Sequence, residues 1–104
     1  MLVLSAQKTI DLKLFEQEGL ECIYPIESDQ VEINRIIREV ASGSICEKQG
    51  DTLKRIITHS DSIDGVMLAC TELPLIHKAF PLSNDLPIID TVEILARRLI
   101  ELAR

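Results

Sequence analysis

A chain of 104 residues with 46% hydrophobic and 27% charged residues has the composition of one ordinary globular domain, which excludes a disordered tail. The net charge of −6 and the scarcity of aromatic residues exclude a nucleic-acid binder, and no apolar run is long enough for a membrane span. Cys22, Cys46 and Cys70 lack a metal-ligand spacing, so we expect free thiols, no bound metal and a cytoplasmic location.

Short apolar runs alternate with stretches of helical periodicity along the chain. The runs predicted to be buried strands are residues 1–4, 20–24, 65–70 and 86–89. The stretches predicted to be helices are residues 9–18, 29–41, 51–60, 72–78 and 91–103. Strands separated by helices are mostly parallel, so this order predicts an α/β fold. We expect residues 1–104 to form a single three-layer lobe with a four-stranded, mostly parallel sheet flanked by helices.

The predicted helix 29–41 illustrates the pattern. Ser28 or Asp29 can cap its start, and Gly43 can adopt the left-handed conformation just past its end. Its apolar stripe, which should lie on the sheet, consists of Val31, Ile33, Ile36, Ile37 and Val40.

One strand-to-helix junction contains a candidate catalytic residue. Cys70 ends the strand 65–70, and Thr71 is a good N-cap for a helix whose first turn tolerates Pro74. A thiol at this switch faces the positive end of a helix, which favours the thiolate, and the free N–H groups can hold a carboxylate. From the residues alone, Cys70 is either a packed apolar side chain or a proton-transfer cysteine.

The motifs around this junction point to a known family. Cys70-Thr71-Glu72, followed by Leu73-Pro74-Leu75, resembles the G-C-T-E signature and Leu-Pro-Leu pattern near the second cysteine of aspartate/glutamate racemases. The segment 87–91 resembles the P-x-x-D-T motif that follows it in the family. The upstream residues that match the family in order are Tyr24-Pro25, Asp29-Gln30, Ile36-Ile37 and Gly43.

The resemblance is to the C-terminal half of these racemases and extends from about residue 2 to residue 102. It implies proton transfer at the α-carbon of an amino acid without pyridoxal phosphate or another cofactor. The family uses two cysteines, one from each of two α/β lobes, and Cys70 would be the catalytic thiol of the second lobe. Thr71, Glu72 and Thr9 would bind the substrate, and Glu72 after Cys-Thr favours the aspartate-type members. With one of the two thiols, the chain alone is expected to be inactive.

The resemblance also implies a partner. The last helix, 91–103, would pack on the missing first lobe, so its apolar face should drive association with such a lobe or with a second copy of the chain. That face consists of Val92, Leu95, Leu99 and Leu102. Two positions depart from the family: Ala69 replaces a glycine, and Ser5-Ala6 stands where the family has Gly-Thr.

Two other functions remain open: a decarboxylase-type relative that works with one cysteine, and a non-catalytic binding or regulatory module, which Ser5-Ala6 favours. The chain could equally be a fragment, a split subunit or a decayed gene product.

The remaining candidate residues have structural interpretations. These predict Cys22 and Cys46 as bystanders, His59 and His77 as solvated surface, Asp90 as a helix cap, Met67 as core, and Glu72 equally as a dipole partner.

Overall fold

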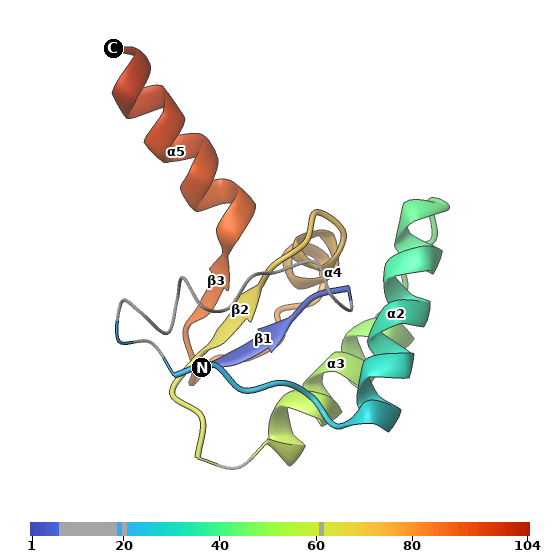
Figure 1. Ribbon diagram of the computed structural model, residues 1–104. Coiled ribbons are helices and arrows are strands. Elements are labelled where there is room, and N and C mark those ends of the chain that lie inside the picture. The colour runs from blue at the N-terminus through green and yellow to red at the C-terminus, as the bar shows by residue number, and fades with distance from the viewer. Residues whose placement is uncertain (7–18, 20, 61) are drawn as a thin grey trace.

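The computed structural model describes residues 1–6, 19, 21–60 and 62–104, and Figure 1 shows the arrangement of the elements. The predicted helix 9–18 and the candidate substrate residue Thr9 lie outside the described residues. The elements in chain order are β1 (Leu2–Leu4), α2 (Glu27–Ala41), α3 (Glu47–His59), β2 (Val66–Leu68), α4 (Leu73–Ala79), β3 (Ile88–Asp90) and α5 (Thr91–Ala103).

The sheet confirms an α/β fold with parallel strands. Its order is β1-β2-β3, and both neighbouring pairs are parallel, with Leu4 opposite Leu68 and Leu68 opposite Asp90. Because all three strands run in the same direction, their carboxyl ends lie at one edge of the sheet. The central strand β2 therefore ends between the ends of its two neighbours.

The prediction of four strands is wrong for the described residues, which form three. In the predicted strand 20–24, Ile23 makes an isolated parallel bridge to Leu2 beside β1. The Ile23 N–H donates to the Met1 carbonyl, and the Val3 N–H donates to the Ile23 carbonyl, both at 2.9 Å. The next donor toward β1 in a parallel ladder would be residue 25, which is proline and has no N–H. Pro25 thus ends the pairing before a full strand develops.

One face of the sheet is covered by α2, α3 and α4 (Figure 1). Strand side chains alternate, so Leu2 and Leu4 of β1 pack among these helices, while Val3 points to the opposite face. Met67 is buried, as predicted, in the same row as Val3. The core is aliphatic and consists of Leu2, Leu4, Ile33, Ile36, Val40, Leu53, Ile56, Ile57, Val66, Leu68, Leu73, Ile76 and Leu82.

Helix α2 begins earlier than predicted. Its N-cap is Ile26, which makes no side-chain cap bond, so the prediction of Ser28 or Asp29 as the cap is wrong. Asp29 is instead buried, with a carboxylate oxygen 3.5 Å from the Arg55 guanidinium on α3. The predicted left-handed turn after the helix is confirmed, since Gly43 has a φ of 94°.

Helix α3 begins at Glu47, four residues before the predicted start. A capping box forms there, because the Gln49 amide oxygen accepts the Cys46 N–H at 3.0 Å and the Cys46 side chain accepts from the third helical residue. The Gln49 amide nitrogen also donates to Glu39 and to the Ser44 carbonyl. These bonds stabilise the turn between α2 and α3, even though the helix then includes Gly50.

Helix α5 has the predicted bounds and no buried residue. It extends from the end of β3 away from the sheet and the other helices (Figure 1). We call its apolar face the α5 stripe: Val92 (42% exposed), Leu95 (59%), Leu99 (57%) and Leu102 (67%). In the described part of the chain, no helix has the length and apolar character needed to span a membrane.

Candidate functional site

The candidate site lies at the carboxyl edge of the sheet. Ser5 follows β1, Cys70 comes two residues after β2, and Asp90 ends β3. The Ala69 N–H donates to the Leu4 carbonyl at 2.9 Å, which extends the pairing of β1 and β2 to the residue before Cys70. The position predicted for Cys70 at the end of the central strand is therefore confirmed.

The Cys70 thiol takes part in the start of α4. Its Sγ accepts the Leu73 N–H at 3.4 Å, and the N-cap residue is Glu72, which makes no side-chain cap bond. The prediction of Thr71 as the N-cap is therefore wrong. The helix starts later because Pro74 occupies its first turn, where a missing N–H costs no hydrogen bond, and the sulfur supplies the acceptor instead.

The protonation of Cys70 also differs from the prediction. Burial raises the pKa of the Cys70 thiol, and this effect outweighs the backbone N–H groups of Leu73 and Glu72, which lower the pKa. The carboxylates of Glu72 and Asp90 raise the pKa further. The N–H groups at the helix start thus favour the thiolate as expected, but the larger effect of burial raises the pKa of Cys70 overall.

Asp90 and Thr91 join the site to α5. The Asp90 Oδ1 atom accepts the N–H groups of Val92 and Glu93 at 3.0 and 3.2 Å, so the predicted cap is confirmed. The Thr91 hydroxyl donates to the Leu68 carbonyl at 3.2 Å. This bond attaches the first residue of α5 to the strand that carries Cys70.

The end of β1 is held by a residue whose role was missed in the sequence. The Gln30 amide nitrogen of α2 donates to the Ser5 carbonyl at 2.7 Å and to the Asn34 side chain at 3.0 Å. Ser5 itself is buried. The sequence does contain the Asp29-Gln30 pair, but the pattern does not show that Gln30 contacts Ser5, which lies 25 residues earlier in the sequence.

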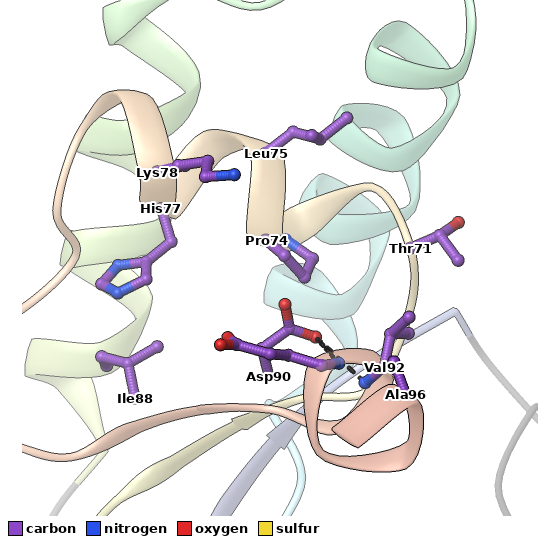
Figure 2. A pocket seen from close by; sticks show the side chains of 10 residues that line it. Thr71, Pro74, Leu75, His77, Lys78, Ile88, Asp90, Val92 and Ala96 are labelled. Carbon is purple, nitrogen blue, oxygen red and sulfur yellow. Dashed lines mark hydrogen bonds between the residues drawn. The ribbon is translucent and has the colours of Figure 1, made fainter. Parts of the chain in front are cut away.

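A cavity of about 590 Å³ opens beside this edge, between α4 and α5. Figure 2 shows Pro74 facing it from α4, Val92 and Ala96 from α5, and the Asp90 cap at its base. Thr71 and Asp90 line the cavity, whereas Cys70 lies next to it. The complete lining is Thr71, Pro74, Leu75, His77, Lys78, Ile88, Asp90, Val92, Glu93 and Ala96.

His77 faces this cavity, and the prediction of a solvated histidine is wrong. Its Nδ1 atom accepts the Leu82 N–H at 3.1 Å, and partial burial lowers the pKa of the imidazole, against a smaller raising effect of Asp90. His59 is exposed at the end of α3, as predicted. The difference arises because the chain folds back after Phe80, which the helical pattern of 72–78 does not indicate.

The other two cysteines are not part of the strand-to-helix junction that holds Cys70. Cys46 is exposed at the start of α3, and Cys22 is half-buried next to the bridge residue Ile23. None of the three cysteines forms a disulfide in the described part of the chain. Among the described residues, no group of His, Cys, Asp and Glu side chains has the arrangement of a metal site.

A comparison with solved structures found one with a similar fold. The chain matches the crystal structure of a putative Asp/Glu racemase from Yersinia pestis with a TM-score of 0.72 and 30% sequence identity. The match covers 86% of this chain and 42% of that chain. The fold is racemase-like. No protein-family model and no curated protein match the sequence.

The chain thus spans less than half the length of the Yersinia pestis protein. What is shared is the α/β lobe with its parallel sheet and covering helices. The carboxyl edge with Cys70 is part of this lobe.

Proposed function

We propose that the chain is one lobe of an amino-acid racemase of the aspartate/glutamate type, with Cys70 as its acid–base group. The observation that carries the proposal is the position of Cys70: a half-buried thiol at the carboxyl end of the central strand, in a chain 30% identical to a protein named as such a racemase. Ligands of parallel α/β sheets collect at this edge, so a substrate placed there would meet the thiol.

The raised pKa of Cys70 supports a proton-donor role in one direction of the reaction. An opposing thiolate would remove the α-proton, breaking the C–H bond and leaving its electron pair on the α-carbon. The Cys70 S–H would then donate its proton to the opposite face, which inverts the centre and leaves Cys70 as thiolate. In the reverse direction Cys70 would be the base.

The opposing thiol would come from another lobe, because neither Cys22, next to the bridge residue Ile23, nor Cys46, at the N-cap of α3, belongs to the junction that holds Cys70. No cofactor is needed in this scheme. Thr71 is exposed beside Cys70 and lines the neighbouring cavity, so its hydroxyl can donate to a substrate carboxylate. Glu72 is half-buried and can accept from the substrate ammonium group. Thr9 completes the proposed substrate set, without a described position.

The experiment is α-proton exchange of L- and D-aspartate and glutamate in deuterated water, followed by NMR. We expect no exchange by the 104-residue chain alone. Mixed with the first lobe of the Yersinia pestis protein, the chain should exchange the α-proton, and Cys70→Ser should lower the rate by a factor of about a hundred or more. The matched control Cys46→Ser should retain the rate. Exchange that survives Cys70→Ser would refute the assignment.

A decarboxylase-type reaction is the second candidate, because it needs one proton donor and the raised pKa keeps Cys70 protonated. A C–CO₂⁻ bond would break, CO₂ would leave, and the Cys70 S–H would protonate the resulting carbanion before water reprotonates the thiolate. Release of CO₂ from a substituted malonate by the chain alone, lost in Cys70→Ser, would favour this reaction over racemisation.

A further inference from the structure

We propose that the cavity between α4 and α5 is a separate binding site for a small zwitterion with an apolar body, of the kind that an aliphatic amino acid presents. Its volume of about 590 Å³ is within the range of small-molecule sites, roughly 300–1,000 Å³. Cys70 is not among the described residues that line the cavity, so a ligand bound there does not require the thiol. The proposal is therefore independent of the racemase chemistry.

The walls of the cavity are apolar. Pro74 and Leu75 line it from α4, Val92 and Ala96 line it from α5, and Ile88 of β3 lies at its floor (Figure 2). Leu75 is 46% exposed and Val92 is 42% exposed, so both present apolar surface to water. An aliphatic group between the two helices would remove this surface from water, which is favourable.

A donor end of the cavity is formed by His77 and Lys78 at the end of α4. Within the part of the chain that the structure describes, Lys78 makes no ion pair. His77 accepts the Leu82 N–H at Nδ1, so the proton of its neutral ring is on Nε2, which can donate. An ammonium group beside an imidazole N–H is suited to binding a carboxylate.

An acceptor end is formed by Asp90 at the start of α5. Its Oδ1 atom accepts the N–H groups of Val92 and Glu93, whereas its second oxygen accepts no hydrogen bond from a described residue. Figure 2 shows this second oxygen directed away from α5, towards Pro74. Glu93 also lines the cavity, but its carboxylate is 2.6 Å from the Arg97 guanidinium. Asp90 is therefore the carboxylate available for a ligand ammonium group.

The two ends together specify a zwitterion. A ligand with only a carboxylate would bring a second negative charge into a cavity that already contains Asp90, and the net charge of the chain is −6. A ligand with only an ammonium group would leave Lys78 unpaired and place a like charge near it. A molecule with both groups pairs with both ends while its apolar body contacts the walls.

The first test uses L-leucine and two analogues that each lack one charged group. Isocaproate lacks the ammonium group, and isoamylamine lacks the carboxylate. Each is titrated into the isotope-labelled chain, and backbone NMR signals are followed. We expect saturable shifts at Thr71, His77 and Val92 with leucine, and binding of leucine about tenfold tighter than that of either analogue. Equal binding of isocaproate, or no saturable shift with leucine, would overturn the proposal.

The second test uses variants of the two ends. Lys78→Gln and Asp90→Asn should each weaken leucine binding by about tenfold, and asparagine retains the N-cap of α5. Lys54→Gln is the matched control, because Lys54 is an exposed lysine on α3 outside the cavity. Cys70→Ser should retain leucine binding. Loss of binding in Cys70→Ser, or unchanged affinity in both Lys78→Gln and Asp90→Asn, would refute the site, whereas the racemase proposal is decided by α-proton exchange alone.

Discussion

Thiol alkylation is controlled by the exposure of the sulfur and by the fraction of thiolate. Cys46 is exposed, whereas Cys70 is half-buried and its pKa is raised by burial. Cys70 should therefore react several-fold more slowly with iodoacetamide at pH 8, and its rate should keep rising with pH beyond the range of an ordinary thiol. Peptide mass spectrometry after timed quenching measures both rates in one sample. Equal rates would contradict the burial of Cys70.

His77 should make the stability of the chain depend on pH. Its folded-state pKa lies below the ordinary value of 6.5, because partial burial disfavours the imidazolium, and protonation of Nδ1 would remove the acceptor for the Leu82 N–H. The unfolded chain binds the proton more readily, so this contribution is present above pH 6.5 and is lost as the pH falls through the folded pKa.

Urea unfolding at several pH values between 5 and 7.5 measures this loss. Replacing the histidine by His77→Gln should flatten the pH dependence over that range, since glutamine does not titrate. His59→Gln is the control, because His59 is exposed at the end of α3 and its loss should leave the pH profile of the original chain. A His77→Gln profile identical to that of the original chain would show that this imidazole is not involved.

At the residue scale, the sequence located Cys70 correctly but not its protonation. The position depends on a local pattern, an apolar run followed by a helix start. The pKa depends on desolvation by surrounding residues and on the carboxylates of Glu72 and Asp90, the latter 20 residues away, which no local pattern contains. The contact of His77 with Leu82 was missed because it depends on the fold of the segment after α4.

Among the elements, α5 depends most on its own local interactions, because it has no buried residue. A 13-residue helix without tertiary packing is marginal in water, so its cap matters more than in a packed helix. Asp90→Ala removes the acceptor for the Val92 and Glu93 N–H groups and should cost about 1 kcal/mol. The result should be a measurable loss of helicity by circular dichroism.

Asp90→Asn is the matched variant, because asparagine is as good an N-cap as aspartate. It should retain the helicity of the original chain while removing one negative charge near Cys70. If Asp90→Ala leaves the helical signal unchanged, packing rather than the cap stabilises α5.

The bounds of α5 and the existence of α2, α3 and α4 were predictable because each has helical periodicity. The start of α3 was not, since the Cys46–Gln49 capping box precedes the apolar pattern and Gly50 interrupts it. The predicted strand 20–24 failed for a reason visible in the sequence: Pro25 cannot donate to β1. An apolar run predicts that a segment is buried, but it does not predict that the segment forms every backbone hydrogen bond of a β-strand.

For the whole molecule, the alternation of strands and helices was sufficient to predict the α/β class and the parallel sheet. The number of strands was not, because pairing depends on which backbone donors face each other. The chain corresponds to 42% of the Yersinia pestis protein, and the site edge lies next to the helix that extends from the body. The apolar face of that helix is open to solvent.

The bond from the Thr91 hydroxyl to the Leu68 carbonyl has a consequence for communication across the molecule. Leu68 precedes Cys70 by two residues on the central strand, and Thr91 is the first residue of α5. A rotation of α5 on meeting a partner would therefore pull on the backbone that positions the thiol and move the Asp90 charge that acts on it. We therefore expect binding at α5 to change the alkylation rate of Cys70, which peptide mass spectrometry can measure.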